Sequence, residues 1–166
     1  MKKITYLDLI KNSPSAQEIA QRPRRPVRVV LDNVRSLYNV GSIFRSSDAA
    51  GVEKIYLCGI TAKPPRAEIS VPWEYFENAA EIVRDLHQCG FEIVVLEHTD
   101  QPQNHFNVKF NYPLCLVVGH EISGISAEVV ALADTAIEIP MFGVKQSLNV
   151  AVAYGIAIYE IVKPWL

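Results

Sequence analysis

The chain has 166 residues, of which 49% are hydrophobic and 20% charged. This composition fits one globular domain with a continuous core and excludes a mainly disordered or low-complexity chain. The three cysteines show no CxxC spacing, so neither a disulfide framework nor a zinc knuckle is predicted. No apolar stretch approaches the roughly 18 residues of a membrane span, and the opening MKKITYLDLIKNS lacks the apolar region of a signal peptide. We therefore expect a cytoplasmic protein.

Charge is distributed unevenly along the chain. Residues 1–66 carry 12 Lys and Arg against 5 Asp and Glu, whereas residues 67–166 are acidic. In QRPRRPVR, Arg22, Arg24 and Arg25 lie beside prolines that disfavour a helix. An extended basic arm over residues 1–26 would suit contacts with phosphates. A solvated arm that only aids solubility is equally compatible with the charge pattern.

Strands and helices alternate after this arm. Runs of apolar and β-branched residues predict strands over about 27–33, 54–59, 91–98, 112–119 and 135–140. Apolar periodicity and cap residues predict helices over about 42–50, 73–90 and 147–162, with a short helix from Ser126. Gly51 and Gly90 are expected to end helices, Ser147 to begin one, and residues 99–112 to be mostly loop. The alternation predicts one α/β domain over residues 27–166, a mainly parallel sheet with helices on both faces.

The last predicted helix is unusually apolar. From Leu148 to Ile158 its only polar side chains are Asn149 and Tyr154. A helix on the surface of a monomer should show a polar face. This helix is therefore either central to the core or half of a subunit interface.

Common nucleotide-binding and hydrolase signatures are missing from the sequence. No GxGxxG follows a predicted strand, and neither a P-loop nor a GxSxG elbow occurs. The four histidines, His87, His98, His105 and His120, lack the spacing of a metal site. These observations disfavour a P-loop enzyme, a dehydrogenase and an α/β-hydrolase, and they predict no bound metal.

Three polar segments each follow the end of a predicted strand. LDNVRSLYNVGSIFRSSDAAG contains Arg35, Asn39 and Arg45. VVGHEISGIS contains Glu121, and IEIPMFGVKQSLN contains Asn149. Because the carboxyl ends of parallel strands share one edge of a doubly wound sheet, where such folds bind ligands, we expect the three segments along one rim.

The same three segments carry a resemblance to a known family. NVGSIFRS, GHEISGIS and IPMFGVKQSLNVAVA resemble, in this order, motifs 1, 2 and 3 of the SpoU/TrmH branch of the SPOUT RNA methyltransferases, and together they span about residues 31–158. The resemblance implies a C-terminal trefoil knot, a homodimer, and methyl transfer from S-adenosylmethionine to a ribose 2′-hydroxyl of tRNA or rRNA. The knot is expected from the resemblance alone, because chain connections are normally unthreaded.

The resemblance also implies roles for individual residues. Those expected to act in catalysis are Asn39, Arg45, Glu121, Ser147 and Asn149. Those expected to hold the cofactor, largely through backbone atoms and apolar walls, are Leu96, Gly119, Ile139, Met141 and Leu148. Those expected to contact RNA are Arg22, Arg24, Arg25 and Arg35. The scheme needs no metal and no membrane.

Arg45 is the family's usual candidate for activating the ribose hydroxyl. Because a guanidinium has a pKa above roughly 12 and stays protonated, we expect it to clamp the adjacent phosphate and stabilise the developing alkoxide. Asn39 would help to orient the hydroxyl. Glu121 could hold Arg45 or Asn39 in place, or accept the proton, and the sequence leaves these roles open.

Two departures from the family pattern bear on the choice of substrate. The chain passes directly from Ser70 to VPWEYF, where the family usually carries a longer stretch, and we expect no separate RNA-binding domain. Target selection would then rest on the arm, the catalytic face and the dimer partner. Two other functions stay open: a non-catalytic knotted domain that binds RNA or cofactor, and a flavodoxin-like or Rossmann oxidoreductase that binds flavin or NAD.

Overall fold

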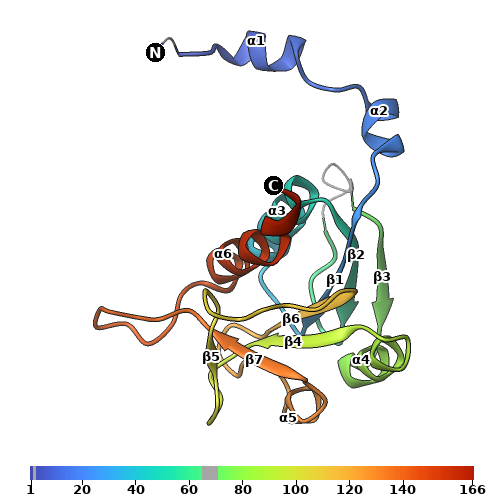
Figure 1. Ribbon diagram of the computed structural model, residues 1–166. Coiled ribbons are helices and arrows are strands. Elements are labelled where there is room, and N and C mark those ends of the chain that lie inside the picture. Colours follow the sequence, from blue (N-terminus) through green and yellow to red (C-terminus); the bar gives the residue numbers. More distant parts are fainter. Residues whose placement is uncertain (2, 65–70) are drawn as a thin grey trace.

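The computed structural model describes residues 1, 3–64 and 71–166. Its strands are β1 (Arg25–Asp32), β2 (Val52–Cys58), β3 (Trp73–Phe76), β4 (Glu92–Leu96), β5 (Gln103–Asn104), β6 (Leu114–Gly119) and β7 (Thr135–Glu138). Within the described residues they form one parallel sheet of seven strands in the order β3-β2-β1-β6-β4-β7-β5 (Figure 1). The predicted α/β class with a mainly parallel sheet is confirmed. The predicted short connection at Ser70 lies outside the described residues.

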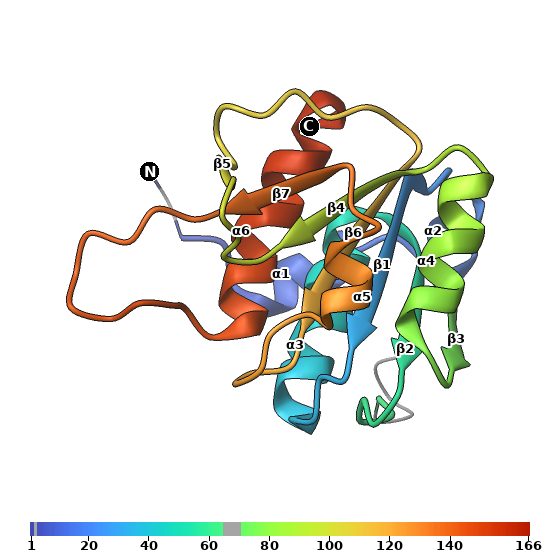
Figure 2. The same cartoon turned by 90° about the horizontal axis from the view of Figure 1, so that it is seen from below.

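Helices cover both faces of this sheet, as predicted. The arm before β1 contains α1 (Tyr6–Lys11) and α2 (Ala16–Gln21), away from the sheet (Figure 1). The helices of the domain are α3 (Leu37–Ala50), α4 (Ala79–Gln88), α5 (Ala127–Val130) and α6 (Val150–Val162), and a 3₁₀ turn, η2 (Lys163–Trp165), follows α6. Helices α3 and α6 pack side by side on one face, while α4 and α5 cover the other (Figure 2). In the part of the chain that is described, no helix is long and apolar enough to cross a membrane.

Each face of the sheet has its own apolar core. Along β1, Val29 and Leu31 belong to the core beneath α3 and α6, whereas Val30 belongs to the core beneath α4 and α5. This division follows from the alternation of side chains along a strand. All three residues are fully buried, because a parallel strand covered on both faces needs apolar residues at successive positions.

The prediction of a helix across WEYF is wrong. Trp73–Phe76 forms β3, which pairs in parallel with β2. The helix begins only at Ala79, where the side chain of Asn78 accepts a hydrogen bond from the backbone N–H of Ala80 at 2.8 Å. Aromatic residues favour strands and asparagine favours helix caps, so a strand forms before Asn78 and a helix begins after it. Helix α4 ends before Gly90, which has a φ of 84°.

Two other helix starts differ from the sequence prediction. Helix α3 begins at Leu37, well before Ser42, because the side chain of Ser36 accepts the N–H of Asn39. Helix α6 is capped by Asn149 and not by Ser147. The predicted end of α3 is confirmed, since Gly51 adopts a left-handed conformation with a φ of 73°. Residues 99–112 are mostly loop, as predicted, apart from the two-residue strand β5.

The last helix is central to the core on one side. Tyr154 is fully buried, and its hydroxyl lies 2.6 Å from Oγ of Ser47 on α3. Burial raises the pKa of this phenol, so it stays a neutral hydrogen-bond donor. On the opposite side of α6, Val152, Ile156 and Tyr159 are 52%, 37% and 43% exposed in the single chain. The helix therefore stabilises the fold while leaving an apolar surface uncovered.

The basic arm enters the fold at the amino end of the sheet. Nη1 of Arg24 donates to the carbonyl of Val52 at 2.9 Å, and Nη2 of Arg25 donates to the carbonyl of Trp165 at 3.3 Å. The guanidinium of Arg25 also lies 5.9 Å from the centre of the Trp165 ring. Because Arg25 begins β1, both arginines lie at the end of the sheet opposite to the carboxyl rim. They make structural contacts there.

Candidate functional site

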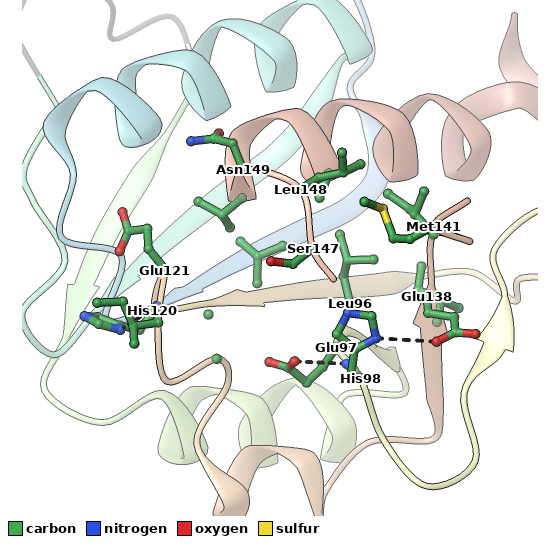
Figure 3. A pocket seen from close by; sticks show the side chains of 18 residues that line it. Leu96, Glu97, His98, His120, Glu121, Glu138, Met141, Ser147, Leu148 and Asn149 are labelled. Carbon is green, nitrogen blue, oxygen red and sulfur yellow. Dashed lines mark hydrogen bonds and ion pairs between the residues drawn. The ribbon is translucent and has the colours of Figure 1, made fainter. Parts of the chain in front are cut away.

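A pocket of about 410 Å³ lies at the carboxyl edge of the sheet. It is enclosed by the segments that follow β4, β6 and β7 and by the first turn of α6 (Figure 3). The residues predicted to hold a cofactor all line it: Leu96, Gly119, Ile139, Met141 and Leu148. Glu121, Ser147 and Asn149 line it as well. Of the three polar segments expected along one rim, the second and third therefore line this pocket.

The turn after β6 is closely packed against its own backbone. A Cβ at Gly119 would lie 2.4 Å from the carbonyl carbon of Gly124, so no other residue fits without moving backbone. Nδ1 of His120 accepts the backbone N–H groups of Ile122 and Ser123, each at 3.1 Å. The pocket wall formed by this turn is consequently rigid. His120 is a structural residue of the turn and carries its proton on Nε2.

A chain of side-chain hydrogen bonds joins the three polar segments. Nδ2 of Asn149 donates to Oδ1 of Asn39 at 3.0 Å. Nδ2 of Asn39 in turn donates to Oε1 of Glu121 at 2.9 Å. Asn149 also caps α6, because its Oδ1 accepts the N–H groups of Ala151 and Val152. We call this set of three side chains the Asn149–Asn39–Glu121 chain.

Glu121 is held as a carboxylate by this arrangement. Partial burial acts to raise its pKa, but the hydrogen bonds it accepts from the Asn39 side chain and from backbone N–H groups outweigh burial and lower the pKa. Two of those backbone donors are the N–H groups of Ser36 at 3.0 Å and Arg35 at 3.3 Å. Of the roles that the sequence left open for Glu121, the structure supports the one in which it holds Asn39.

Arg45 is not part of that chain. It lies on the exposed side of α3, roughly 1.7 turns beyond Asn39. Among the described residues its guanidinium has no ion-pair partner, and Glu53, one of the two acids considered from the sequence, pairs with Arg28 instead at 3.1 Å. Arg35 is exposed near the mouth of the pocket. Both arginines are therefore free to meet a ligand from solvent.

The charge of the pocket limits what it can hold. Glu97, Glu121 and Glu138 line it together with apolar side chains, and no Lys or Arg among the described residues does so. A cationic group such as a sulfonium or an ammonium suits these carboxylates, whereas the pyrophosphate of a flavin or nicotinamide dinucleotide does not. No cluster of three or more metal-ligating side chains occurs in the described ranges.

Three pocket residues were not predicted individually from the sequence. Glu97 and His98 follow β4, and Glu138 ends β7. Oε2 of Glu97 accepts the N–H of Ile125 at 2.8 Å, which ties the β4 segment to the turn after β6. The signal that could have identified them is a polar residue near the carboxyl end of a predicted strand.

Comparisons with known proteins agree with this geometry. The family model described as the SpoU rRNA Methylase family matches residues 26–159. The tRNA (guanosine(18)-2'-O)-methyltransferase of Aquifex aeolicus is 36% identical over 93% of this chain and 77% of its own length. The crystal structure of the A. aeolicus TrmH/SpoU tRNA modifying enzyme has a TM-score of 0.81 at 34% identity, covering 89% of this chain and 79% of that one. The AdoMet-bound rRNA methyltransferase from Sinorhizobium meliloti has a TM-score of 0.78 at 28% identity, covering 89% and 60%.

The hydrogen bonds to Glu121 predict how its carboxyl titrates. In the folded protein its pKa should lie below the ordinary value of 4.5, and Asn39→Ala should move it upward. Since the folded pKa is depressed, the carboxylate stabilises the fold above the unfolded-state pKa, and this contribution is lost as pH falls through the native pKa.

The measurement is an NMR titration of the Glu121 carboxyl carbon, combined with urea unfolding of the wild type and Glu121→Gln. The difference in unfolding free energy should be largest near neutral pH and vanish in acid. A titration midpoint at or above 4.5 would contradict this account.

Proposed function

The chain belongs to the SpoU rRNA methylase family and is an S-adenosylmethionine-dependent RNA ribose 2′-O-methyltransferase, and we propose that its RNA substrate is tRNA. The named tRNA methyltransferase is similar over most of both chains, whereas this chain spans 60% of the rRNA enzyme. The observation that carries the site assignment is the Asn149–Asn39–Glu121 chain at the mouth of a carboxylate-lined pocket.

The pocket fits S-adenosylmethionine in size and in charge. Its volume of about 410 Å³ is ample for a nucleoside ligand. Leu96, Ile139, Met141 and Leu148 would enclose the adenine, and Gly119 would offer close backbone contact. When bound, the cofactor supplies an electrophilic methyl group. The remaining demands of the reaction, alignment and stabilisation of the attacking oxygen, fall on the protein.

Asn39 would orient the ribose hydroxyl. One hydrogen of its Nδ2 is directed to Glu121, and its Oδ1 accepts from Asn149, so the amide is fixed in one orientation. The second Nδ2 hydrogen remains for the RNA. Glu121, as a carboxylate with a lowered pKa, acts as the support of Asn39 and is a poor proton acceptor. Ser147 lines the pocket on the side of α6 and would contact the cofactor or the ribose.

Arg45 would act on the RNA and not on the cofactor. It does not line the pocket, it is exposed, and it follows Asn39 on the same helix. A guanidinium in this position can clamp the phosphate next to the ribose and stabilise the developing alkoxide. Arg35 would add a second phosphate contact near the pocket mouth. Arg22, Arg24 and Arg25 would then meet the RNA well away from the methylated ribose, at the amino end of the sheet.

We also propose a homodimer built on the uncovered side of α6. This side presents Val152, Ile156 and Tyr159, and the loop before the helix adds Phe142 and Val144, which are 98% and 94% exposed. Large apolar side chains exposed on one element and on the loop next to it are typical of an interaction site. A two-fold interface would bring the two copies of this surface together and cover them.

A trefoil knot is the remaining part of the proposal. Strand β7 lies between β4 and β5, which follow one another in the sequence, so the chain from β4 to β5 spans β7. After β7 the chain crosses to the opposite side of the pocket and forms α6 beside α3. This arrangement supports a threaded path, for which the family resemblance is the main argument.

The substrate and the role of Arg45 are tested together by single-turnover methylation of unmodified tRNA and of rRNA fragments. We expect methylation of a ribose in tRNA. Arg45→Ala should lower the rate by about 10²-fold or more, the scale of one lost preorganised contact to an oxyanion. Affinity for S-adenosylhomocysteine should barely change, and Arg45→Lys should restore little, because a point charge cannot replace a bidentate fork.

Arg84→Ala is the matched control, since Arg84 is an exposed arginine on α4 that pairs with Glu128 on the other face of the sheet. It should methylate like the wild type. Near-normal turnover of Arg45→Ala, or a loss of cofactor binding as large as its loss of activity, would refute the role given to Arg45. Methylation of rRNA alone would refute the substrate.

The dimer predicts the effect of a charge on α6. Val152→Glu should yield a monomer, because the interface would have to bury an unpaired carboxylate. Light scattering at micromolar concentration measures the mass, with Ala127→Glu, an exposed position on α5, as the control that stays dimeric. A monomeric wild type, or a dimeric Val152→Glu, would refute the proposed dimer interface on α6.

A further inference from the structure

The loop over residues 139–149 joins β7 to α6 and completes the pocket. It contributes Met141, Ser147 and Leu148 to the pocket wall and ends at Asn149. Residues 142–149 are all exposed, and the loop projects from the body of the domain (Figure 2). A segment with so little burial needs a specific contact to fix its end near Ser147.

His98 provides such a contact. Its Nε2 lies 3.1 Å from the backbone carbonyl oxygen of Gln146, the residue before Ser147. Its Nδ1 lies 3.5 Å from Oε2 of Glu138 at the end of β7, as Figure 3 shows. One imidazole therefore joins the two ends of the loop.

Both partners of the ring are acceptors. A backbone carbonyl has no hydrogen to donate, and neither has a carboxylate. The imidazolium form, which carries a hydrogen on each ring nitrogen, therefore suits both contacts.

Two further charged residues are neighbours of this contact in sequence. Glu97 precedes His98, and its Oε1 accepts the backbone N–H of His98 at 2.9 Å. Lys145, next to Gln146, is exposed, and no contact between it and His98 occurs in the described part of the chain. Within that part, the carboxylate that pairs with the imidazole is therefore the one of Glu138.

We propose that His98 is a positioning residue for the cofactor pocket, whose imidazolium fastens the loop over residues 139–149 between Glu138 and Gln146. The identity of the ligand rests on the proposed function, whereas the fastening of the loop does not. When this contact is broken, the loop loosens and cofactor affinity falls.

The test uses His98→Gln, which is always neutral, His98→Arg, which is always charged, and Glu138→Gln. Calorimetry measures the Kd for S-adenosylhomocysteine. Hydrogen exchange of residues 139–149 in the ligand-free protein provides a second readout. The matched control is His87→Gln, because His87 forms a similar pair with Asp134 at 3.2 Å away from the pocket, with a side chain 54% exposed against 56% for His98.

In His98→Gln and Glu138→Gln the Kd should rise about fivefold, the scale of a partly exposed ion pair, and hydrogen exchange of the loop should become faster. His98→Arg, which keeps a positive charge, and His87→Gln should bind and exchange like the wild type. Wild-type affinity and loop exchange in His98→Gln would overturn the proposal.

The two proposals fail in different ways. If S-adenosylhomocysteine binds the wild type and binds His98→Gln more weakly, but no RNA is methylated, the proposed substrate is refuted and the role of His98 stands. A wild type that binds no S-adenosylhomocysteine refutes the ligand, and loop exchange in His98→Gln then decides the role of His98.

Discussion

The Asn149–Asn39–Glu121 chain is the interaction on which the site depends. Its members come from the start of α6, the first turn of α3 and the turn after β6, which are far apart in the sequence. Two of the side chains also bind nearby backbone, since Asn149 caps α6 and Glu121 accepts N–H groups before α3. Removing one member would leave polar groups of the others unsatisfied, so the contacts that build the fold also align the site.

The order of the strands in the sheet brings the three polar segments together. Strands β1 and β6 are neighbours, with Asp32 in register with Gly119, so the first two polar segments emerge together. The third segment follows β7, two strands away from β6, and must cross the edge of β4 to reach them. The pocket occupies the space that this crossing encloses. Its walls combine apolar strand ends with carboxylates, a setting that suits a compact cation flanked by an adenine.

Much of this architecture could be predicted from the sequence because its signals are local and strong. The β-branched runs of β1 and β6, the left-handed Gly51 and the polar residues after strands all act over a few positions. The WEYF segment was predicted as helix because its aromatic residues fit a helical period as well as an edge strand. Its pairing with β2, which the local sequence does not encode, makes it a strand.

The sequence left Arg45 and Asn39 open as the residue that Glu121 holds, because the choice depends on where the turn after β6 meets α3. The same holds for Arg24 and Arg25, whose carbonyl partners at Val52 and Trp165 are set by long-range packing.

The central claim is that the Asn149–Asn39–Glu121 chain acts as one unit in aligning the ribose. Single-turnover methylation of Asn39→Ala, Asn149→Ala and the double variant, at saturating cofactor and RNA, tests it most directly. We expect the double variant to be about as slow as the slower single variant, because breaking either hydrogen bond already releases Asn39. Rate losses that multiply in the double variant would show that the two residues act independently and would contradict this account.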